Sequence, residues 1–209
     1  MKKKLITLLT AAAMALGMIA SQAQATLWTL DVSNVDLGVP GPYATVNIDV
    51  TGNVATFTID ANDAILNSGG STNFGIDKFF FNTGLTTITA SDFSNLTNWA
   101  VAYDKTASSF GNFMLEFKGT ASAQLDPLIF TITDAAITNP LDFYVANTAG
   151  YHFATHIRAF DPLLNGESSA FFSDGTPPPP PVPEPGTIML LGVGLFGLAV
   201  YGKRRMLKE

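Results

Sequence analysis

The chain has 209 residues, enough for one domain with accessory segments, and its 16 phenylalanines and low content of charged residues (13%) indicate a packed core. It contains no cysteine, which excludes disulfides, thiolate metal sites and cysteine nucleophiles. Residues 26–175 carry four Lys and Arg against fifteen Asp and Glu, and this acidic balance argues against DNA or RNA as a partner.

The first 25 residues have the three-part pattern of a secretory signal peptide. Three lysines precede an uncharged run over residues 5–20, and Ala23-Gln24-Ala25 forms an A-x-A cleavage site. We expect cleavage after Ala25 and export of the remainder. The alternative, an uncleaved membrane anchor, leaves the small-residue cleavage site unexplained.

Residues 26–175 contain short segments of alternating apolar and polar residues, which predict β-strands. Segments 43–50 and 53–60 flank Thr51-Gly52 and predict a hairpin. Its inward-facing residues are predicted to be Ala44, Val46, Ile48, Val50, Ala55, Phe57 and Ile59. Further strands are predicted at 27–32, 75–82, 85–90, 98–103, 111–118, 128–133, 141–146, 151–157 and 169–173.

The clearest alternation lies in segment 111–118. It predicts that Phe113, Leu115 and Phe117 face inward and that Met114, Glu116 and Lys118 face outward. No segment of the body sustains a helical period, and 133–138 offers one or two turns at most. We therefore predict an all-β fold for residues 26–175, an antiparallel β-sandwich that is jelly-roll-like.

Two histidines, His152 and His156, have the spacing of a metal pair on a helix. The zincin signature requires Glu after the first His, where Phe153 stands, and the local alternation is that of a strand. Arg158 on the same face would repel a cation. We therefore expect two histidines on a solvated face, and neither a metal nor another cofactor.

The segment with Asp60, Asn62 and Asp63 offers oxygen ligands of the kind that calcium prefers. It departs from the EF-hand pattern, because Ile65 stands where that pattern needs glycine. Asp and Asn at a strand end are also ordinary turn formers. Both interpretations, a calcium loop and a plain turn, stay open at this point.

Signatures of catalysis are missing from the body: there is no G-x-S-x-G elbow and no phosphate-binding glycine loop. Carboxylates are numerous enough for a glycosidase pair, yet no pattern sets two of them across a cleft. A groove around Trp99 and Tyr103 would favour sugar binding. Threonine is frequent but follows no regular repeat of the kind that an ice-binding array needs.

Three different segments follow the body. Residues 176–186 are a proline-rich spacer, which favours extended polyproline structure. Residues 187–202 are uncharged and mostly apolar, and residues 203–209 are basic. We predict a single transmembrane helix at 187–202, with Lys203, Arg204 and Arg205 on the cytoplasmic side. A buried core helix is the alternative, and the basic flank argues against it.

This ending resembles the PEP-CTERM sorting signal of exported bacterial proteins. The resemblance rests on Val182-Pro183-Glu184-Pro185, the apolar segment and Arg204-Arg205, in that order. It implies recognition of Pro-Glu-Pro by an exosortase in the inner membrane of a Gram-negative, exopolysaccharide-producing bacterium, followed by delivery to the surface. The same motif has been catalogued under an ice-binding-protein label, which describes the tail and does not indicate ice binding.

Together these patterns predict a non-enzymatic exported surface or extracellular-matrix protein. Its expected partners are the exosortase, the membrane before processing, and exopolysaccharide. The alternative is a secreted carbohydrate-active enzyme, or a calcium-dependent glycan-binding module, on the same scaffold.

Overall fold

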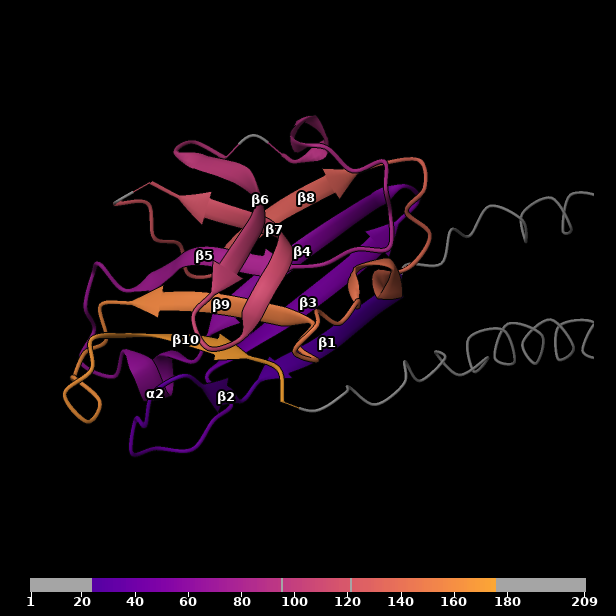
Figure 1. Cartoon of the computed structure of the whole chain (residues 1–209). Coiled ribbons are helices and arrows are strands. Elements are labelled where there is room, and N and C mark those ends of the chain that lie inside the picture. The colour runs from indigo at the N-terminus through magenta and orange to yellow at the C-terminus, as the bar shows by residue number, and fades with distance from the viewer. Residues whose placement is uncertain (1–23, 95, 121, 176–209) are drawn as a thin grey trace, which may run out of the picture. The chain divides into compact units, whose positions relative to one another are not determined.

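The structure, a computed structural model, describes residues 24–94, 96–120 and 122–175 (Figure 1). These residues form ten strands, one short α-helix and two 3-10 helices. In chain order the elements are β1 (Gln24–Leu30), β2 (Val32–Ser33), β3 (Ala44–Thr51), β4 (Val54–Ala61), α2 (Asp63–Leu66), β5 (Gly75–Phe81), η1 (Ala90–Asp92), β6 (Trp99–Ala107), β7 (Gly111–Gly119), β8 (Leu128–Thr133), η2 (Pro140–Phe143), β9 (Phe153–Arg158) and β10 (Ser169–Ser173).

The strands form two antiparallel sheets, as Figure 1 shows. One has four strands in the order β1-β3-β4-β8, and the other has six in the order β2-β10-β9-β5-β7-β6. The predicted all-β fold is confirmed, with two antiparallel sheets and little helix. β1 begins at Gln24, so cleavage after Ala25 would leave Thr26, which pairs with Ile48, as the first residue of the strand.

The predicted hairpin is β3–β4, whose last pair is Thr51 with Val54. Its turn is therefore Gly52-Asn53, one residue later than predicted. Gly52 has a φ of +63°, a left-handed conformation that glycine adopts without steric cost. The predicted inward residues are all buried in the core: Ala44, Val46, Ile48, Val50, Ala55, Phe57 and Ile59.

Phenylalanine rings fill the space between the two sheets. Phe57 on β4 stacks on Phe130 of β8, with ring centroids 4.7 Å apart. It also meets Phe81 on β5, in the other sheet, at 5.3 Å. Phe130 in turn contacts Phe117 of β7 at 4.6 Å. The Phe57–Phe81 and Phe130–Phe117 pairs join the two sheets, and each contributes about 0.5–1.5 kcal/mol beyond the area that it buries.

A second, smaller cluster lies on the outer face of the six-stranded sheet. It comprises Phe80, Ala107, Phe110, Phe113 and Ala154. β5 pairs with β7 over only four residues, whereas β6 and β7 pair along most of their length. The part of the β6–β7 ribbon that lies beyond the β5 pairing therefore packs onto β5 and β9. In Figure 1 the ribbon passes in front of these two strands.

This ribbon changes the burial expected for strand 111–118. Phe113, Leu115 and Phe117 are buried as predicted, and Lys118 is exposed. The prediction that Glu116 faces solvent is wrong, because the side chain is only 6% exposed. Its strand neighbours are Phe80 on β5 and Ala102 on β6, so strands cover it on both sides.

Two predicted strands, 85–90 and 141–146, are also wrong, since residues 85–89 form a loop that leads into the 3-10 helix η1 and 141–146 overlaps the 3-10 helix η2. Both helices begin with a capping box. Thr89 and Asp92 exchange side-chain and backbone hydrogen bonds at η1, and Asn139 and Asp142 do so at η2. The segment 133–138 forms a turn, and α2 was not predicted.

The predicted transmembrane helix at 187–202 and the signal peptide up to Ala23 lie outside the described residues. Within residues 24–175, leaving aside 95 and 121, no helix has the length and apolarity that crossing a membrane requires.

Replacing Phe57 with Ala should destabilise the domain by about 3–5 kcal/mol, because it opens a cavity where both sheets meet. Ile129→Ala is the matched control, since Ile129 is 48% exposed on the neighbouring strand β8. Urea unfolding of residues 26–175, followed by circular dichroism, measures both. Equal losses for the two variants would show that the inter-sheet aromatic layer is not the main stabilising contact.

Candidate functional site

Each of the two histidines contacts a different carboxylate. His156 on β9 contacts Asp77 of β5, with 2.6 Å between Nδ1 and Oδ1. His152, just before β9, contacts Asp174, with 2.7 Å between Nδ1 and Oδ2. The side chains of His156 and His152 are 15% and 17% exposed, so the face predicted to be solvated is only partly open to solvent at these residues. Each histidine is therefore held by its own carboxylate.

Asp174 joins the C-terminal end of the domain to the start of β9 through hydrogen bonds. Its Oδ1 accepts the backbone N–H of His152 at 2.9 Å and of Phe153 at 3.0 Å, while Oδ2 meets the His152 ring. The next residue, Gly175, donates its N–H to Asp31 Oδ1 at 3.0 Å. Asp174 is only 3% exposed, so these hydrogen bonds form away from solvent, where leaving a group unpaired is costly.

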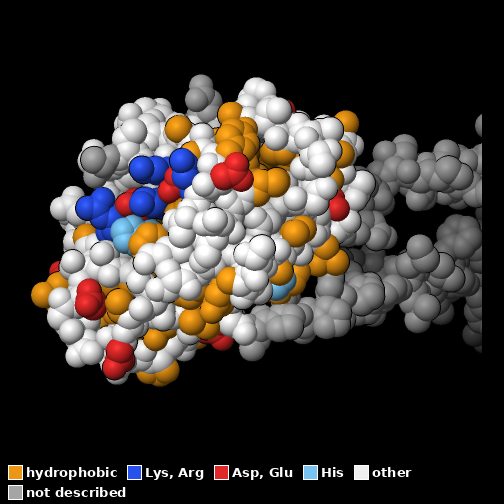
Figure 2. Space-filling view, viewed as in Figure 1, with side chains coloured by type: hydrophobic (Ala, Val, Ile, Leu, Met, Phe, Trp, Pro, Cys, Tyr) orange, Lys and Arg blue, Asp and Glu red, His pale blue; other side chains and the backbone are white. Residues whose placement is uncertain are grey.

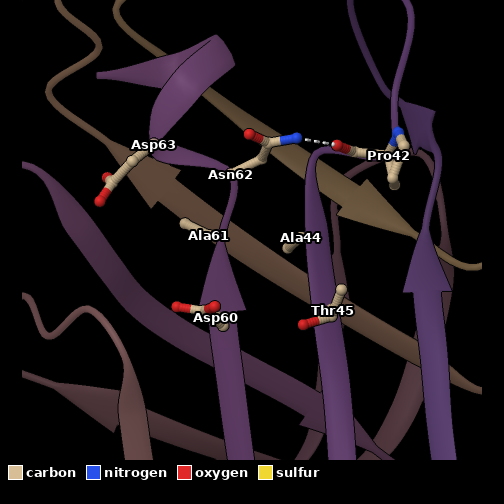
Figure 3. Close-up of a pocket in the computed structure, with 7 residues that line it drawn as sticks. All are labelled: Pro42, Ala44, Thr45, Asp60, Ala61, Asn62 and Asp63. Atoms are coloured by element: carbon tan, nitrogen blue, oxygen red, sulfur yellow. Dashed lines mark hydrogen bonds between the residues drawn. The ribbon is translucent and has the colours of Figure 1, made fainter. Parts of the chain in front are cut away.

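The predicted calcium segment lines a shallow pocket of about 330 Å³ (Figure 3). Asp60 and Asp63 point their carboxylates to the same side of β4, away from Thr45 on β3 (Figure 3). Asn62 turns the other way, and its Nδ2 donates to the carbonyl of Pro42 at 2.9 Å. Asn62 therefore acts as a turn former that ties β4 to the start of β3.

A third carboxyl, Asp126, joins this acidic group from the segment before β8. The pKa of Asp126 is raised to about 6, mainly because the carboxyl is partly buried; the hydrogen bond from the Ala61 N–H lowers this pKa, and the carboxylates of Asp63 and Asp60 raise it. That N–H donates to Asp126 Oδ1 at 2.9 Å. Asp126 does not line the pocket, and its contact joins the end of β4 to β8.

The acidic group lacks the clustering of side chains that a metal site requires. Across the described part of the chain, no three His, Cys, Asp or Glu side chains are grouped so that they could hold a metal ion. Asp60, Asp63 and Asp126 therefore do not converge as calcium ligands in this arrangement. Of the two interpretations of the segment, the hydrogen bonds support the turn.

Trp99 and Tyr103 do not share one environment. Trp99 packs against Phe117, with ring centroids 5.1 Å apart, and is half-buried. Tyr103 is 45% exposed. Neither lines the acidic pocket or the second pocket, which lies beside Arg158. Neither pocket therefore supplies the groove around these two residues that would favour sugar binding.

The residues that sequence reasoning missed are Asp77 and Asp174. They lie 79 and 22 residues from the histidines that they hold, so no local pattern could have indicated the pairs. The predicted sorting and cleavage residues lie outside the described chain, except for Ala25 in β1. They are Ala23, Val182, Pro183, Glu184, Pro185, Lys203, Arg204 and Arg205.

Comparison with known families identifies the end of the chain. Residues 181–205 match the family model described as the PEP-CTERM protein-sorting motif. The chain carries a PEP-CTERM sorting motif. The predicted resemblance is thus confirmed, and the matched stretch includes the Val-Pro-Glu-Pro run and Lys203–Arg205. No curated protein and no solved structure matches the chain.

The PEP-CTERM motif indicates how the chain is exported and sorted. It indicates an exported protein whose precursor is anchored in a membrane and is sorted by an exosortase. The roles of the individual residues within the motif stay predictions.

Asp126→Asn should stabilise the domain at pH 7.5 by about 3 °C in Tm, and much less at pH 4.5. The folded-state pKa of about 6 lies above the usual value, so wild-type stability falls as pH rises between about 4 and 7. Asn keeps the acceptor for the Ala61 N–H but carries no charge. We keep the magnitude small because Asp126 is partly exposed to screening solvent.

Thermal unfolding of residues 26–175 at the two pH values checks this expectation. Asp63→Asn is the companion variant, and it should remove part of the same pH dependence because its carboxylate raises the pKa of Asp126. An Asp126→Asn effect that is equal at both pH values would contradict the assignment.

Asp174→Ala should destabilise the domain by about 3 kcal/mol, because it leaves two buried N–H groups and a histidine ring without their acceptor. Asp174→Asn should cost less, since Oδ1 can still accept both N–H groups. Urea unfolding measures the three proteins. If Ala and Asn cost the same, the backbone hydrogen bonds contribute nothing measurable.

Proposed function

We propose that this chain is a non-enzymatic surface or extracellular-matrix protein of a Gram-negative bacterium. The observation that carries the proposal is the PEP-CTERM match at residues 181–205, following an acidic β-sandwich. An exosortase in the inner membrane would process the precursor, and the body would act at the cell surface or outside the cell. On this proposal the sandwich is jelly-roll-like and contacts exopolysaccharide.

The end of the domain supports this arrangement. Asp174 and Gly175 are held by hydrogen bonds to His152, Phe153 and Asp31. The seven prolines between 177 and 185 follow immediately in the sequence. Proline has no N–H to donate and favours an extended backbone, which is the substrate conformation that a protease needs. The folded domain would thus end just before the segment to be processed.

A secreted carbohydrate-active enzyme remains the alternative. One observation favours it: Asp126 has a pKa raised to about 6 and lies beside Asp63, and glycosidases use a carboxyl pair of this kind. Against this, Asp126 Oδ1 is occupied by the Ala61 N–H and the residue does not line the pocket. Hydrolase assays on glycans, with and without EDTA, separate this alternative and the calcium-dependent module from the proposed role.

Glu184→Ala should block sorting and leave the folded body unchanged. Glu184 is the only charged residue between Asp174 and Lys203, so it offers a unique contact for a processing enzyme. The variant should accumulate in the inner membrane with its basic tail attached. Deleting residues 187–209 should instead release the body as a soluble exported protein. Fractionation of the native host, with mass spectrometry of the mature C-terminus, measures both.

Glu167→Ala is the matched control, because Glu167 is an exposed glutamate of the body. It should reach the wild-type location with the wild-type terminus. If Glu184→Ala also does so, the processing proposal fails, and the tail acts as a plain membrane anchor.

A further inference from the structure

Positive charge in this acidic domain is concentrated in one place. Of its four Lys and Arg residues, Lys78, Lys118 and Arg158 share the outer face of the six-stranded sheet. Lys78 on β5 pairs with Lys118 on β7 and with His156 on β9, and Arg158 follows His156 on the same face. Figure 2 shows Lys and Arg side chains gathered in one patch, with a His beside them. We call Lys78, Lys118, Arg158 and His156 the basic patch.

The patch is unfavourable for folding. Like charges directly opposite each other on neighbouring strands destabilise a sheet, and Lys78 and Lys118 are such a pair. Among the residues that the structure describes, neither lysine has a carboxylate within 4 Å. Lys78 gains only a contact with the Phe171 ring, 5.8 Å from its centroid. An anion bound between the lysines would relieve this repulsion.

Two carboxylates lie close to the patch but leave its charge incompletely neutralised. Asp77 contacts His156 at 2.6 Å and Arg158 at 3.5 Å. The Arg158 side chain remains 42% exposed, so part of its donor fork is accessible. Glu116 shares the face two residues before Lys118, and it is buried. The exposed groups of the patch are therefore mainly cationic.

A polar pocket of about 300 Å³ adjoins Arg158. Its lining is Asn73, Gln124, Arg158, Ala159, Ser168 and Ser169. Amide and hydroxyl side chains of this kind both donate and accept hydrogen bonds, as sugar hydroxyl groups do. The guanidinium supplies a planar donor pair that suits a carboxylate. Hydroxyl recognition and carboxylate recognition thus meet at one edge of the patch.

We propose that the basic patch and this adjoining pocket bind a carboxylated polysaccharide. Arg158 would hold the carboxylate of one sugar while the polar side chains contact its hydroxyl groups. Lys78 and Lys118 would meet carboxylates further along the same polymer, so that several weak contacts act together. This inference rests on the proposed surface role for the choice of a polysaccharide as the ligand.

The surroundings of the patch favour this ligand over a denser polyanion. Residues 26–175 contain fifteen Asp and Glu, and among the described residues Asp77 alone forms ion pairs with members of the patch. Their field repels a nucleic acid or an anionic membrane, which would extend far beyond a few cations. A polymer with one charge per sugar can place its carboxylates on the patch and its uncharged groups elsewhere.

The test is binding of the full-length chain, purified in detergent, to polygalacturonate, with uncharged dextran as the comparison. EDTA is present, so that calcium bridges play no part. We expect binding to polygalacturonate that weakens as salt is added, and none to dextran. The double variant Lys78→Gln/Lys118→Gln should bind about tenfold more weakly, since each exposed ion pair contributes less than about 1 kcal/mol.

Lys105→Gln is the matched control, because Lys105 is the fourth cation of the domain and lies on β6 outside the patch. It should bind as the wild type does. The double variant should also melt no lower than the wild type, because it removes a like-charge pair. This measurement distinguishes lost binding from lost folding.

Three results would overturn the inference: equal affinity for polygalacturonate and dextran, equal weakening by Lys105→Gln and the double variant, or binding to anionic lipid vesicles without binding to polygalacturonate. Different results would contradict the proposed function. A wild-type chain that is sorted normally but does not bind the polymer contradicts only the patch. A double variant that is mislocalised while still binding contradicts both assignments.

Discussion

Everything in this domain depends on aromatic packing between two sheets. The chain has no cysteine, so the exported body has no covalent cross-link between its strands. Aromatic pairs between the sheets hold them together instead: Phe57 with Phe81 at 5.3 Å and Phe130 with Phe117 at 4.6 Å between ring centroids. Because strand residues alternate between faces, the side chains that are not part of this inner layer lie on the outer faces, where the β6–β7 ribbon covers some of them, and at the strand ends. Both pockets and the basic patch lie there.

The same alternation explains how much of the fold the sequence could predict. It predicted the inward faces of β3 and β4 correctly, because burial repeats every second residue in these strands. It failed at 85–90, which is rich in β-branched threonine, and at 141–146, where apolar residues alternate; in these regions Thr89 with Asp92, and Asn139 with Asp142, cap 3-10 helices. Threonine and asparagine followed three residues later by aspartate were the missed signals. Burial of Glu116 was unpredictable, because it depends on pairing with Phe80 of β5, a strand that is separated from β7 in sequence by β6.

The candidate sites also differ in whether they are formed by consecutive residues or by distant strands, and only the former could be predicted from the sequence. The PEP-CTERM motif is a linear signal in consecutive segments, so the sequence alone identified it. The pairs His152–Asp174 and His156–Asp77 depend on strand order and could not be read locally. Lys78 and Lys118 are likewise 40 residues apart and meet only because β5 and β7 are neighbours. A charge count found an acidic body, and only the sheet topology reveals its basic patch.

The location of the Asp174 contacts relates the sandwich to its sorting signal. Any tension on the segment after Gly175 would act first on β10, which pairs with β9 over five residues and with β2 over only two. A strand with so short a partner on one side is poorly protected against peeling from the sheet. The buried Asp174 carboxylate holds His152 and Phe153, and Gly175 holds Asp31, beyond the last β10 pair. These hydrogen bonds must break before β10 can separate from the sheet. They therefore help the domain to remain folded while its C-terminal segment is processed at a membrane.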